Sequence, residues 1–308
     1  MFHVKQPEKA SPKSDFGMDT PLAREIADLS ARRRALEGVQ LHFGGETRIL
    51  TVSNQKGGVG KTTSAVNVAA ALSGLGAKVL VIDLDPQGNA STALGVPHNA
   101  ETPSVYDVLI EDTPLADIVQ QSPEDENLFC APSTIHLAGA EIELVAQVAR
   151  EHRLRRALDV YLIDSPMDFV IIDCPPSLGL LTINAFTAAR EVFIPIQCEY
   201  YALEGLSQLL GSIQMIQKHL NPDLHLSTIL LTMFDGRTRL AQQVADEVRT
   251  HFPQQVLDTV IPRSVRVSEA PSFGQTVIAY DGQSAGAVAY REAAVEIASR
   301  TATQSKEK

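Results

Sequence analysis

A glycine-rich segment between an apolar run and a helical stretch constrains the fold of this chain more than any other part of the sequence. The segment SNQKGGVGKTT occupies residues 53–63, at the end of the strand predicted over 49–53 and at the start of a helix predicted over 62–75. A strand that turns through glycines into a helix is the setting in which backbone N–H groups bind phosphate. The segment therefore predicts a phosphate-binding loop at the end of a strand.

The residues of this loop suit a nucleotide with a magnesium ion. The glycines leave room for backbone N–H groups around phosphate oxygens, and the helix directs its positive end to the same place. Lys61 supplies a cation for the β- and γ-phosphates, and the Thr62 hydroxyl is placed to bind Mg²⁺. The strict pattern GxxxxGK[ST] fails at its first position, where Gln55 stands, and a second lysine, Lys56, begins the loop instead. A purely structural turn is the alternative, and the run GGVGKTT in this context argues against it.

Short apolar runs alternate with helical stretches from residue 48 onward. Runs that are apolar on both faces and separated by helices predict an α/β fold, a doubly wound, mostly parallel sheet with helices on both faces. Right-handed crossovers place the carboxyl ends of such strands along one edge, where ligands bind. The expected strands are 49–53, 79–83, 127–131, 169–173, 192–196, 228–232 and 256–261. The expected helices are 62–75, 138–150, 178–189, 202–219, 240–251 and 285–300.

Acidic residues end two of these strands, as a phosphate site with a metal requires. Asp83 and Asp85 end the run VLVIDLD, and in extended backbone their side chains project to the same side. One can hold the water shell of the metal while the other directs an attacking water at the γ-phosphate. Asp173 ends the hydrophobic run FVIID, the form of a Walker B element. An acid in this place can instead cap the next helix, and the nearby phosphate loop favours a role in the site.

The overall charge excludes proteins that hold DNA through bulk positive charge. The chain has 308 residues with 26 Lys+Arg against 37 Asp+Glu, a net charge of −11. Any contact with nucleic acid must therefore come from a local basic patch. The N-terminus has no apolar signal region, and no run approaches the ~18 apolar residues of a bilayer span, so we expect a soluble, cytoplasmic protein. Cys130, Cys174 and Cys198 form no paired motif and are expected to be buried, reduced thiols.

One large domain with a short extension at each end is expected. Residues 1–20 have no periodicity and predict a disordered tail, whereas Pro21 to about Gln40 predicts an amphipathic helix interrupted by Arg32–Arg34. This helix is expected to rest on the main domain, with a docking site for a partner or a basic contact to DNA as alternatives. The expected parts are a tail plus helix over 1–46, a single domain that carries the phosphate loop over 47–300, and a polar tail over 301–308.

At these motifs the sequence resembles the ParA/Soj/MinD group of P-loop ATPases with a deviant Walker A motif, and most closely its ParA (Soj-type) partition ATPases. The resemblance covers about residues 47–300 and leaves 1–46 without a counterpart. It implies a P-loop NTPase fold and Mg²⁺-dependent hydrolysis of ATP to ADP and phosphate. The motifs that carry it are KGGVGKTT at 56–63, DLDPQGN at 83–89, IIDCPPS at 171–177, EYYALEG at 199–205, LTMFDGRT at 231–238 and IPRSVRVSEAPSFG at 261–274.

The resemblance implies a role for each matching residue. Lys56 resembles a signature lysine that crosses the interface of an ATP-bound dimer and contacts the partner's nucleotide. Lys61 corresponds to the Walker A lysine, and Asp85 to the acid that orients the lytic water. The metal residues would be Thr62 as a direct Mg²⁺ ligand, with Asp83 and Asp173 acting through its bound water. The nucleotide-binding residues would be Lys56, Gly57, Gly58, Val59, Gly60, Lys61, Thr62, Thr63, Met233, Pro262, Arg263 and Val265.

The same resemblance implies sequence-independent binding of double-stranded DNA by arginines that the ATP-bound homodimer exposes. Arg237 and Arg266 fall at those positions. Charge alone would be a weak signal, because residues 235–266 carry five arginines and four acids. The implied partners are a second copy with ATP, DNA at the nucleoid, and a ParB-type centromere-binding protein that stimulates hydrolysis. A pole-associated protein on the N-terminal extension is a further expectation, and the cargo is a chromosome or a plasmid.

Other functions share parts of this pattern. A MinD-type membrane-cycling ATPase needs bulky apolar residues in a C-terminal amphipathic helix, where residues 286–308 offer mainly Ala and Val. An iron–sulfur reductase or cluster carrier needs cysteines at a dimer interface or in a paired motif, and the three cysteines here have no paired spacing. The DPQGN and EYYALEG segments and the absence of a second substrate domain argue against a synthetase that activates a carboxylate. A non-enzymatic scaffold would leave the strand-end acids without a purpose.

Overall fold

The computed structural model describes residues 20–200 and 202–304, which divide into two compact units between Gly38 and Val39. In the first unit, α1 (Pro21–Glu37) begins where the Thr20 hydroxyl accepts a hydrogen bond from the Ala23 N–H, and it ends at Gly38. A helix is therefore present where one was expected from Pro21 to about Gln40. The expected disordered tail lies outside the described residues, apart from Thr20.

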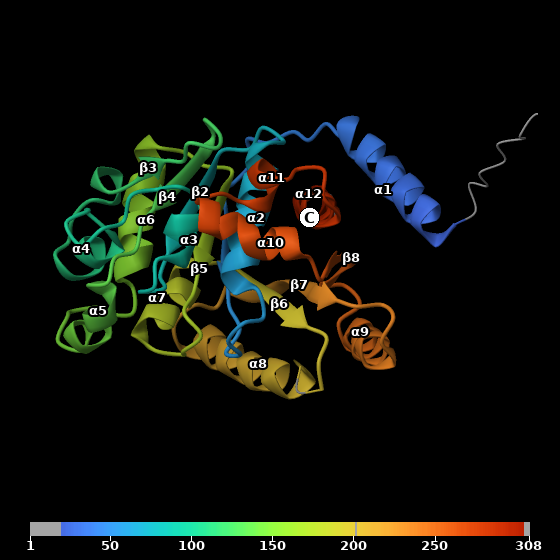
Figure 1. The fold of residues 1–308 in the computed structure, drawn as a ribbon. Coiled ribbons are helices and arrows are strands. Elements are labelled where there is room, and N and C mark those ends of the chain that lie inside the picture. Colours follow the sequence, from blue (N-terminus) through green and yellow to red (C-terminus); the bar gives the residue numbers. More distant parts are fainter. Residues whose placement is uncertain (1–19, 201, 305–308) are drawn as a thin grey trace, which may run out of the picture. The chain divides into compact units, whose positions relative to one another are not determined.

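The described part of the second unit contains an eight-stranded sheet (Figure 1). Its strands are β1 (Arg48–Val52), β2 (Val79–Asp83), β3 (Gln120–Gln121), β4 (Leu128–Ala131), β5 (Phe169–Asp173), β6 (Glu191–Gln197), β7 (His225–Phe234) and β8 (Val256–Pro262). Their order across the sheet is β3-β4-β2-β5-β1-β6-β7-β8, and only the β3–β4 pair is antiparallel. The carboxyl ends of the parallel strands therefore share one edge, as the sequence predicts.

Helices cover both faces of this sheet and enclose two separate apolar cores. Along β6, Val192, Ile194 and Ile196 enter one core and Phe193 enters the other, because successive side chains point to opposite faces. The first core is covered by α4 (Val105–Ile110), α5 (Leu137–Leu144), α6 (Arg153–Asp164), α7 (Leu180–Ala188), α8 (Ala202–His219) and α9 (Arg239–His251). The second is covered by α2 (Lys61–Ser73), α3 (Asn89–Ala93), α11 (Val277–Tyr280) and α12 (Ala285–Gln304). Two shorter 3-10 turns, η1 (Leu115–Asp117) and η2 (Ala270–Phe273), and the short α10 (Val265–Glu269) complete the unit.

All seven strands expected from the apolar runs are present, and the doubly wound fold is confirmed. The helix expected over 138–150 is wrong in its second half, because α5 ends at Leu144 and the chain turns through Ala149 at φ 51°. The helix α6 is not among the expected helices, because arginines at 153, 155 and 156 obscure its buried face, which is formed by Leu154, Leu158 and Tyr161.

Both ends of the second unit differ from the expected boundaries. Residues 39–47 belong to this unit, where the Phe43 ring packs edge-on against Phe169 at 6.0 Å between centroids and Glu46 pairs with Arg190. At the other end, α12 continues to Gln304, four residues into the segment expected to be a polar tail, and 305–308 lie outside the described residues. Within the described parts of the chain, no helix is both long and apolar enough to cross a membrane.

The buried side-chain amide of Asn221 connects α7, α8 and β7 and offers a test of their packing. The Asn221 Nδ2 group is buried and donates to the carbonyls of Phe186 at 2.8 Å and Ala189 at 2.6 Å, which end α7. Asn221 follows α8 and leads into β7. The side chain therefore supplies donors that the last turn of α7 lacks.

We expect Asn221→Ala to lower the free energy of unfolding by about 2–3 kcal/mol, because buried carbonyls lose their donors. Urea unfolding without nucleotide measures this value. Gln214→Ala, at an exposed position of the neighbouring α8, is the control and should change it by less than about 0.5 kcal/mol. Equal stability of the two variants would contradict the role given to the amide.

Candidate functional site

The phosphate loop connects β1 to α2 at the carboxyl edge of the sheet, as predicted. Gly58 and Gly60 have φ of +74° and +86°, in the left-handed region that side chains other than glycine rarely adopt, and Gly60 directly precedes α2. Gly57 is not required by its backbone or by its neighbours. Its φ is outside that region, and a Cβ there would meet no described atom within 4 Å. The fold of one copy therefore requires two of the three glycines.

Hydrogen bonds from neighbouring strands fix this loop. The Asn54 side chain donates to the Pro195 carbonyl of β6 at 2.8 Å and accepts from the Lys56 N–H at 3.0 Å. The Thr232 hydroxyl of β7 donates to the Val59 carbonyl at 2.8 Å. Val59 itself is buried in the domain, so its side chain anchors the loop while its neighbours remain available to a ligand.

The two lysines of the loop have different surroundings. Lys61 opens α2, is 8% exposed, and places its Nζ 3.4 Å from the Lys56 carbonyl. Burial lowers the pKa of Lys61, and the nearby carboxylates of Asp173 and Asp85 oppose that shift. Lys56 instead points its Nζ to Glu199 at 2.6 Å, and the Gln197 amide donates to the same carboxylate. Lys61 thus faces the acids of the site, whereas Lys56 is held by a residue that follows β6.

The three predicted acids occupy two kinds of position. Asp83 and Asp173 are register partners at the ends of β2 and β5, and both are fully buried. Asp83 accepts from the Ser91 N–H and hydroxyl at 2.8 and 2.7 Å, and burial raises its pKa to about 6. Asp85 lies beyond the end of β2 and is partly exposed, so the same-side arrangement assumed for extended backbone ends at Asp83.

Asp173 meets the requirements of a metal site. Neither of its carboxylate oxygens has a hydrogen-bond partner of normal geometry among the described residues. Burial and the neighbouring Asp83 raise the pKa of Asp173 well above its usual range, and Thr62 and Lys61 oppose this only in part. Buried carboxylate oxygens beside a threonine hydroxyl suit Mg²⁺, which prefers oxygen ligands and keeps several waters. The residues present therefore fit the expected ion.

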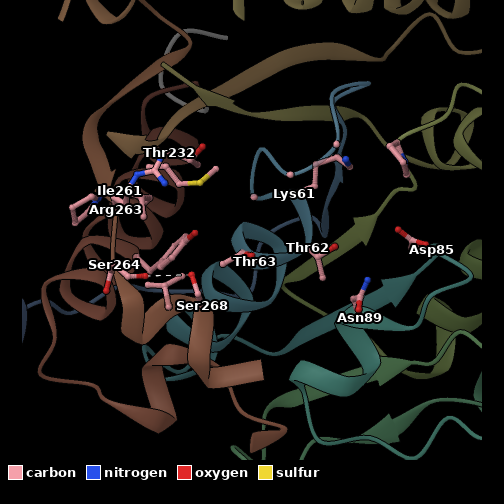
Figure 2. A pocket seen from close by; sticks show the side chains of 18 residues that line it. Lys61, Thr62, Thr63, Asp85, Asn89, Thr232, Ile261, Arg263, Ser264 and Ser268 are labelled. Atoms are coloured by element: carbon pink, nitrogen blue, oxygen red, sulfur yellow. Dashed lines mark hydrogen bonds between the residues drawn. The ribbon is translucent and has the colours of Figure 1, made fainter. Parts of the chain in front are cut away.

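A cavity of about 400 Å³ opens beside the loop (Figure 2). Lys61, Thr62 and Asp85 lie toward one end of it, and Thr232, Ile261 and Arg263 toward the other (Figure 2). The predicted residues that line it are Gly57, Gly58, Gly60, Lys61, Thr62, Thr63, Asp85, Met233, Pro262 and Arg263. The lining residues that the sequence analysis missed are Asn89, Pro176, Thr232, Ile261, Ser264, Val267, Ser268 and Tyr290.

The structure places Val265, predicted to contact the nucleotide, outside this cavity. It is 72% exposed at the start of α10, and the cavity is lined instead by Val267 and Ser268 of the same helix. Tyr290 reaches the cavity from α12, where it is buried and its hydroxyl lies 3.4 Å from the Ser64 hydroxyl. No motif marks Tyr290, whereas Asn89 and Thr232 lie inside two of the motifs already quoted.

Met233 shows backbone strain at the wall of the cavity. Its φ is +48°, in the left-handed region, although it is not a glycine. Such a conformation costs of the order of 1–3 kcal/mol and is concentrated at functional sites. The bend turns the end of β7 along the cavity and into the 235–238 turn that carries Arg237.

Both arginines predicted to bind DNA are exposed and paired with acids of the same chain. The Arg237 side chain is 90% exposed and lies 2.8 Å from Asp235. The Arg266 side chain is 56% exposed and lies 3.3 Å from Glu269 and 3.4 Å from Asp281. Exposed pairs of this kind contribute little to stability.

Comparison with known proteins gives consistent matches. A family model described as an AAA domain matches residues 47–226. The chain is 54% identical over 251 residues to the sporulation initiation inhibitor protein Soj of Bacillus subtilis (strain 168), covering 82% of this chain and 98% of that protein. It is 49% identical over 253 residues to the chromosome partitioning protein ParA of Caulobacter vibrioides (strain NA1000 / CB15N), covering 82% and 94%.

Solved structures match over a similar length. One is described as cobyrinic acid a,c-diamide synthase from Mycobacterium smegmatis with bound ADP and magnesium, with a TM-score of 0.70, 39% identity, and coverage of 85% of this chain and 96% of that chain. Another is the septum site-determining protein MinD of Pyrococcus horikoshii OT3 with Mg-ADP, with a TM-score of 0.65, 26% identity, and coverage of 84% and 97%.

We expect Lys61→Ala to weaken binding of a nucleoside triphosphate about 10- to 100-fold, because one charge-assisted contact to phosphate is lost. Titration calorimetry with Mg²⁺ measures the affinity. Lys78→Ala removes a lysine whose Nζ lies over the Phe129 ring and should leave the affinity unchanged. An unaltered affinity in Lys61→Ala would remove this lysine from the site.

Proposed function

The chain belongs to the ParA/Soj family of P-loop ATPases, and from this premise we propose that it drives chromosome or plasmid partitioning as an ATP-dependent dimer that holds DNA. It is an ATPase that uses ATP and Mg²⁺. Its relatives Soj and ParA match it over more than nine-tenths of their own length. The dimer, the DNA contact and the stimulating partner are parts of the proposal.

The position of Lys56 carries the proposal. One nucleotide site needs one lysine in its loop, and Lys61 fills that role at the cavity. Lys56 is 38% exposed, does not line the cavity of its own copy, and adjoins Gly57, which the fold of one copy does not require to be glycine. These features suit a loop that meets the loop of a second copy, with Lys56 attracted to the γ-phosphate bound there. ADP lacks that charge, so hydrolysis would loosen the dimer.

Within one copy, the described residues suit slow hydrolysis. The loop N–H groups and Lys61 would bind the β- and γ-phosphates, and Thr62 with Asp83 and Asp173 would hold Mg²⁺ and its water. When bound, Mg²⁺ neutralises charge on the phosphate oxygens. Asp85 lines the same end of the cavity and would orient the attacking water. Arg263 lies toward the opposite end (Figure 2), so we expect a ParB-type protein to supply the missing stimulation.

DNA binding would depend on two small patches acting together. Arg237 and Arg266 give one copy few phosphate contacts within a chain of net charge −11. A dimer doubles these contacts on one assembly, and the affinity for DNA rises with each phosphate neutralised. The ATP-bound dimer would therefore lie at the nucleoid, and the ADP-bound copy would be free of DNA.

The MinD-like alternative has less support in the structure. The C-terminal helix α12 buries Ala287, Tyr290 and Ile297 in the second core, so these residues are not available to a membrane. The cluster-carrier alternative is also disfavoured, because all three cysteines are buried and burial raises the pKa of Cys174 to about 12.

The synthetase alternative is favoured by one observation, the 39% identity to the Mycobacterium smegmatis structure. Identities of 54% to Soj and 49% to ParA support partitioning over that activity. The two functions differ in what accelerates ATP turnover. Partitioning predicts stimulation by DNA with a centromere-binding protein, whereas a synthetase predicts stimulation by a carboxylic acid with an amide donor.

The N-terminal extension would add a partner specific to this chain. The family model begins at residue 47, and α1 precedes it with the run Arg32–Arg34. We propose that this segment binds a pole-associated protein or regulates the dimer.

We expect Asp85→Ala to bind ATP, form the dimer and reduce turnover at least 100-fold, because the attacking water loses its orienting carboxylate. Light scattering should show doubled particle mass with ATP and a single mass with ADP, and phosphate release measures turnover. Adding Lys56→Ala to this variant should restore the single mass. Asp117→Ala, an exposed acid on η1, is the control. One unchanged mass with ATP, ADP and no nucleotide would overturn the proposed dimer.

Charge reversal at both arginines tests the DNA face. With Arg237→Glu and Arg266→Glu we expect DNA release and unchanged ATP-dependent mass, with the log–log salt slope reduced by about 3 to 4 for two arginines in each of two copies. Fluorescence anisotropy with a short duplex over a salt series measures both quantities. Arg155→Glu with Arg156→Glu on α6 is the matched control for net charge. Unchanged affinity in the first pair would move the DNA face elsewhere, with Arg32–Arg34 as the next candidate.

A further inference from the structure

The two proposed DNA-binding arginines are close in the chain to residues that line the nucleotide cavity. Met233 at the end of β7 lines the cavity, and Arg237 follows four residues later. In α10, Val267 and Ser268 line the cavity while Arg266 is 56% exposed. Each arginine is therefore at most four residues along the chain from a residue that lines the cavity that would hold ATP.

Asp235 binds Arg237 in a fixed geometry. Two parallel contacts join Arg237 Nε to Oδ1 and Nη2 to Oδ2, both at 2.8 Å. The Arg237 N–H also donates to Oδ1 at 3.1 Å, so the turn itself holds the carboxylate in place. These contacts lower the pKa of Asp235 to about 2, with a smaller contribution from Arg263 in the cavity wall. The acid therefore stays charged at neutral pH, as the pairing with Arg237 requires.

Arg266 is held from three sides. Its Nη1 lies 3.3 Å from Glu269, and its Nε lies 3.4 Å from Asp281. Its guanidinium also lies over the Tyr280 ring at 6.0 Å, and that ring stacks on Phe273 at 5.0 Å between centroids. Two carboxylates and the stacked rings of Tyr280 and Phe273 thus hold Arg266 at the surface.

We propose that Asp235, Glu269 and Asp281 form an acidic mask that occupies the two arginines in place of DNA phosphates. A carboxylate and a phosphate use the same paired N–H groups of a guanidinium, so they compete for Arg237 and Arg266. The mask would lower the affinity of every copy for DNA, so one copy with its few phosphate contacts would be a poor DNA ligand. This inference rests on the proposed DNA face and adds a limit on its affinity.

Competition from the mask has a definite size. A displaced carboxylate stays within a few ångströms of the incoming phosphate and repels it, which at 4 Å in water weakens binding about fivefold. Because the acids are in the chain, this cost applies to each copy at every protein concentration. The effect should shrink as salt screens both interactions.

Neutralising the mask tests the inference. Asp235→Asn keeps an oxygen that can accept from the Arg237 N–H, and Glu269→Gln leaves the size of the side chain almost unchanged. We expect the pair to bind a short DNA duplex of mixed sequence in the presence of ADP about 5- to 25-fold more tightly than the natural chain. Because the cost applies to each copy, binding with ATP should tighten by at least the same factor, with the ATP-dependent particle mass unchanged. Asp281→Asn with Glu269→Gln, confined to Arg266, is the second variant if Asp235→Asn disturbs the turn.

Asp159→Asn with Asp164→Asn on α6 removes the same charge from another surface and is the control for net charge. An equal gain in DNA affinity in this control, or no gain in DNA affinity in either mask variant, would overturn the proposed mask. The charge reversal at Arg237 and Arg266 separates this failure from that of the proposed function. If that reversal leaves DNA affinity with ATP unchanged, the DNA face itself is wrong; if it abolishes binding while the mask variants match the natural chain, only the mask is wrong.

Discussion

Two buried carboxylates at the ends of neighbouring parallel strands impose the main electrostatic constraint on this fold. Asp83 and Asp173 are register partners with no exposed surface, so each opposes the ionisation of the other. Two charges cannot be held there without cations or hydrogen-bond donors. Ser91 supplies donors to Asp83, and Lys61 approaches from the phosphate loop. A divalent cation bound with Thr62 and water would complete the compensation, so the same acids that strain the apo fold make a magnesium site.

The loop and the acids could be predicted because their chemistry is local in the sequence. A strand, a glycine turn and a helix follow one another in residues 49–75, and each acid directly ends an apolar run. Tyr290 could not be predicted, because it reaches the cavity only through the packing of α12 against α2. The motif at 261–274 did not distinguish Val265 from Val267. Which of the two faces the cavity depends on the rotation of α10 about its axis, which the sequence alone does not fix. The Lys56–Glu199 pair likewise joins residues 143 positions apart, across β6.

The helix α6 shows why amphipathic helices can be missed. Its buried residues at 154, 158 and 161 have helical spacing, but arginines lie among them and Arg153 itself is buried. That arginine donates to the Leu109 carbonyl and pairs with Asp112, an exposed residue, at 2.6 Å, so its charge is compensated at the edge of the domain. Arg153 therefore makes a buried contact, whereas a hydrophobic pattern in the sequence would assign any arginine to the solvent-exposed face of the helix.

One strand connects the phosphate loop to the outer surface. The Thr232 hydroxyl of β7 holds the Val59 carbonyl, and the same methyl-bearing side chain lies 3.8 Å from the position a Cβ of Gly60 would take. The next residue, Met233, is strained at the cavity wall, and the 235–238 turn follows at once. The residue that holds the phosphate loop and the Asp235–Arg237 pair therefore lie within six consecutive residues, 232–237. Because Arg263 of the adjacent β8–α10 connection adds to the field at Asp235, the nucleotide site and the acid that pairs with Arg237 share one charged neighbour.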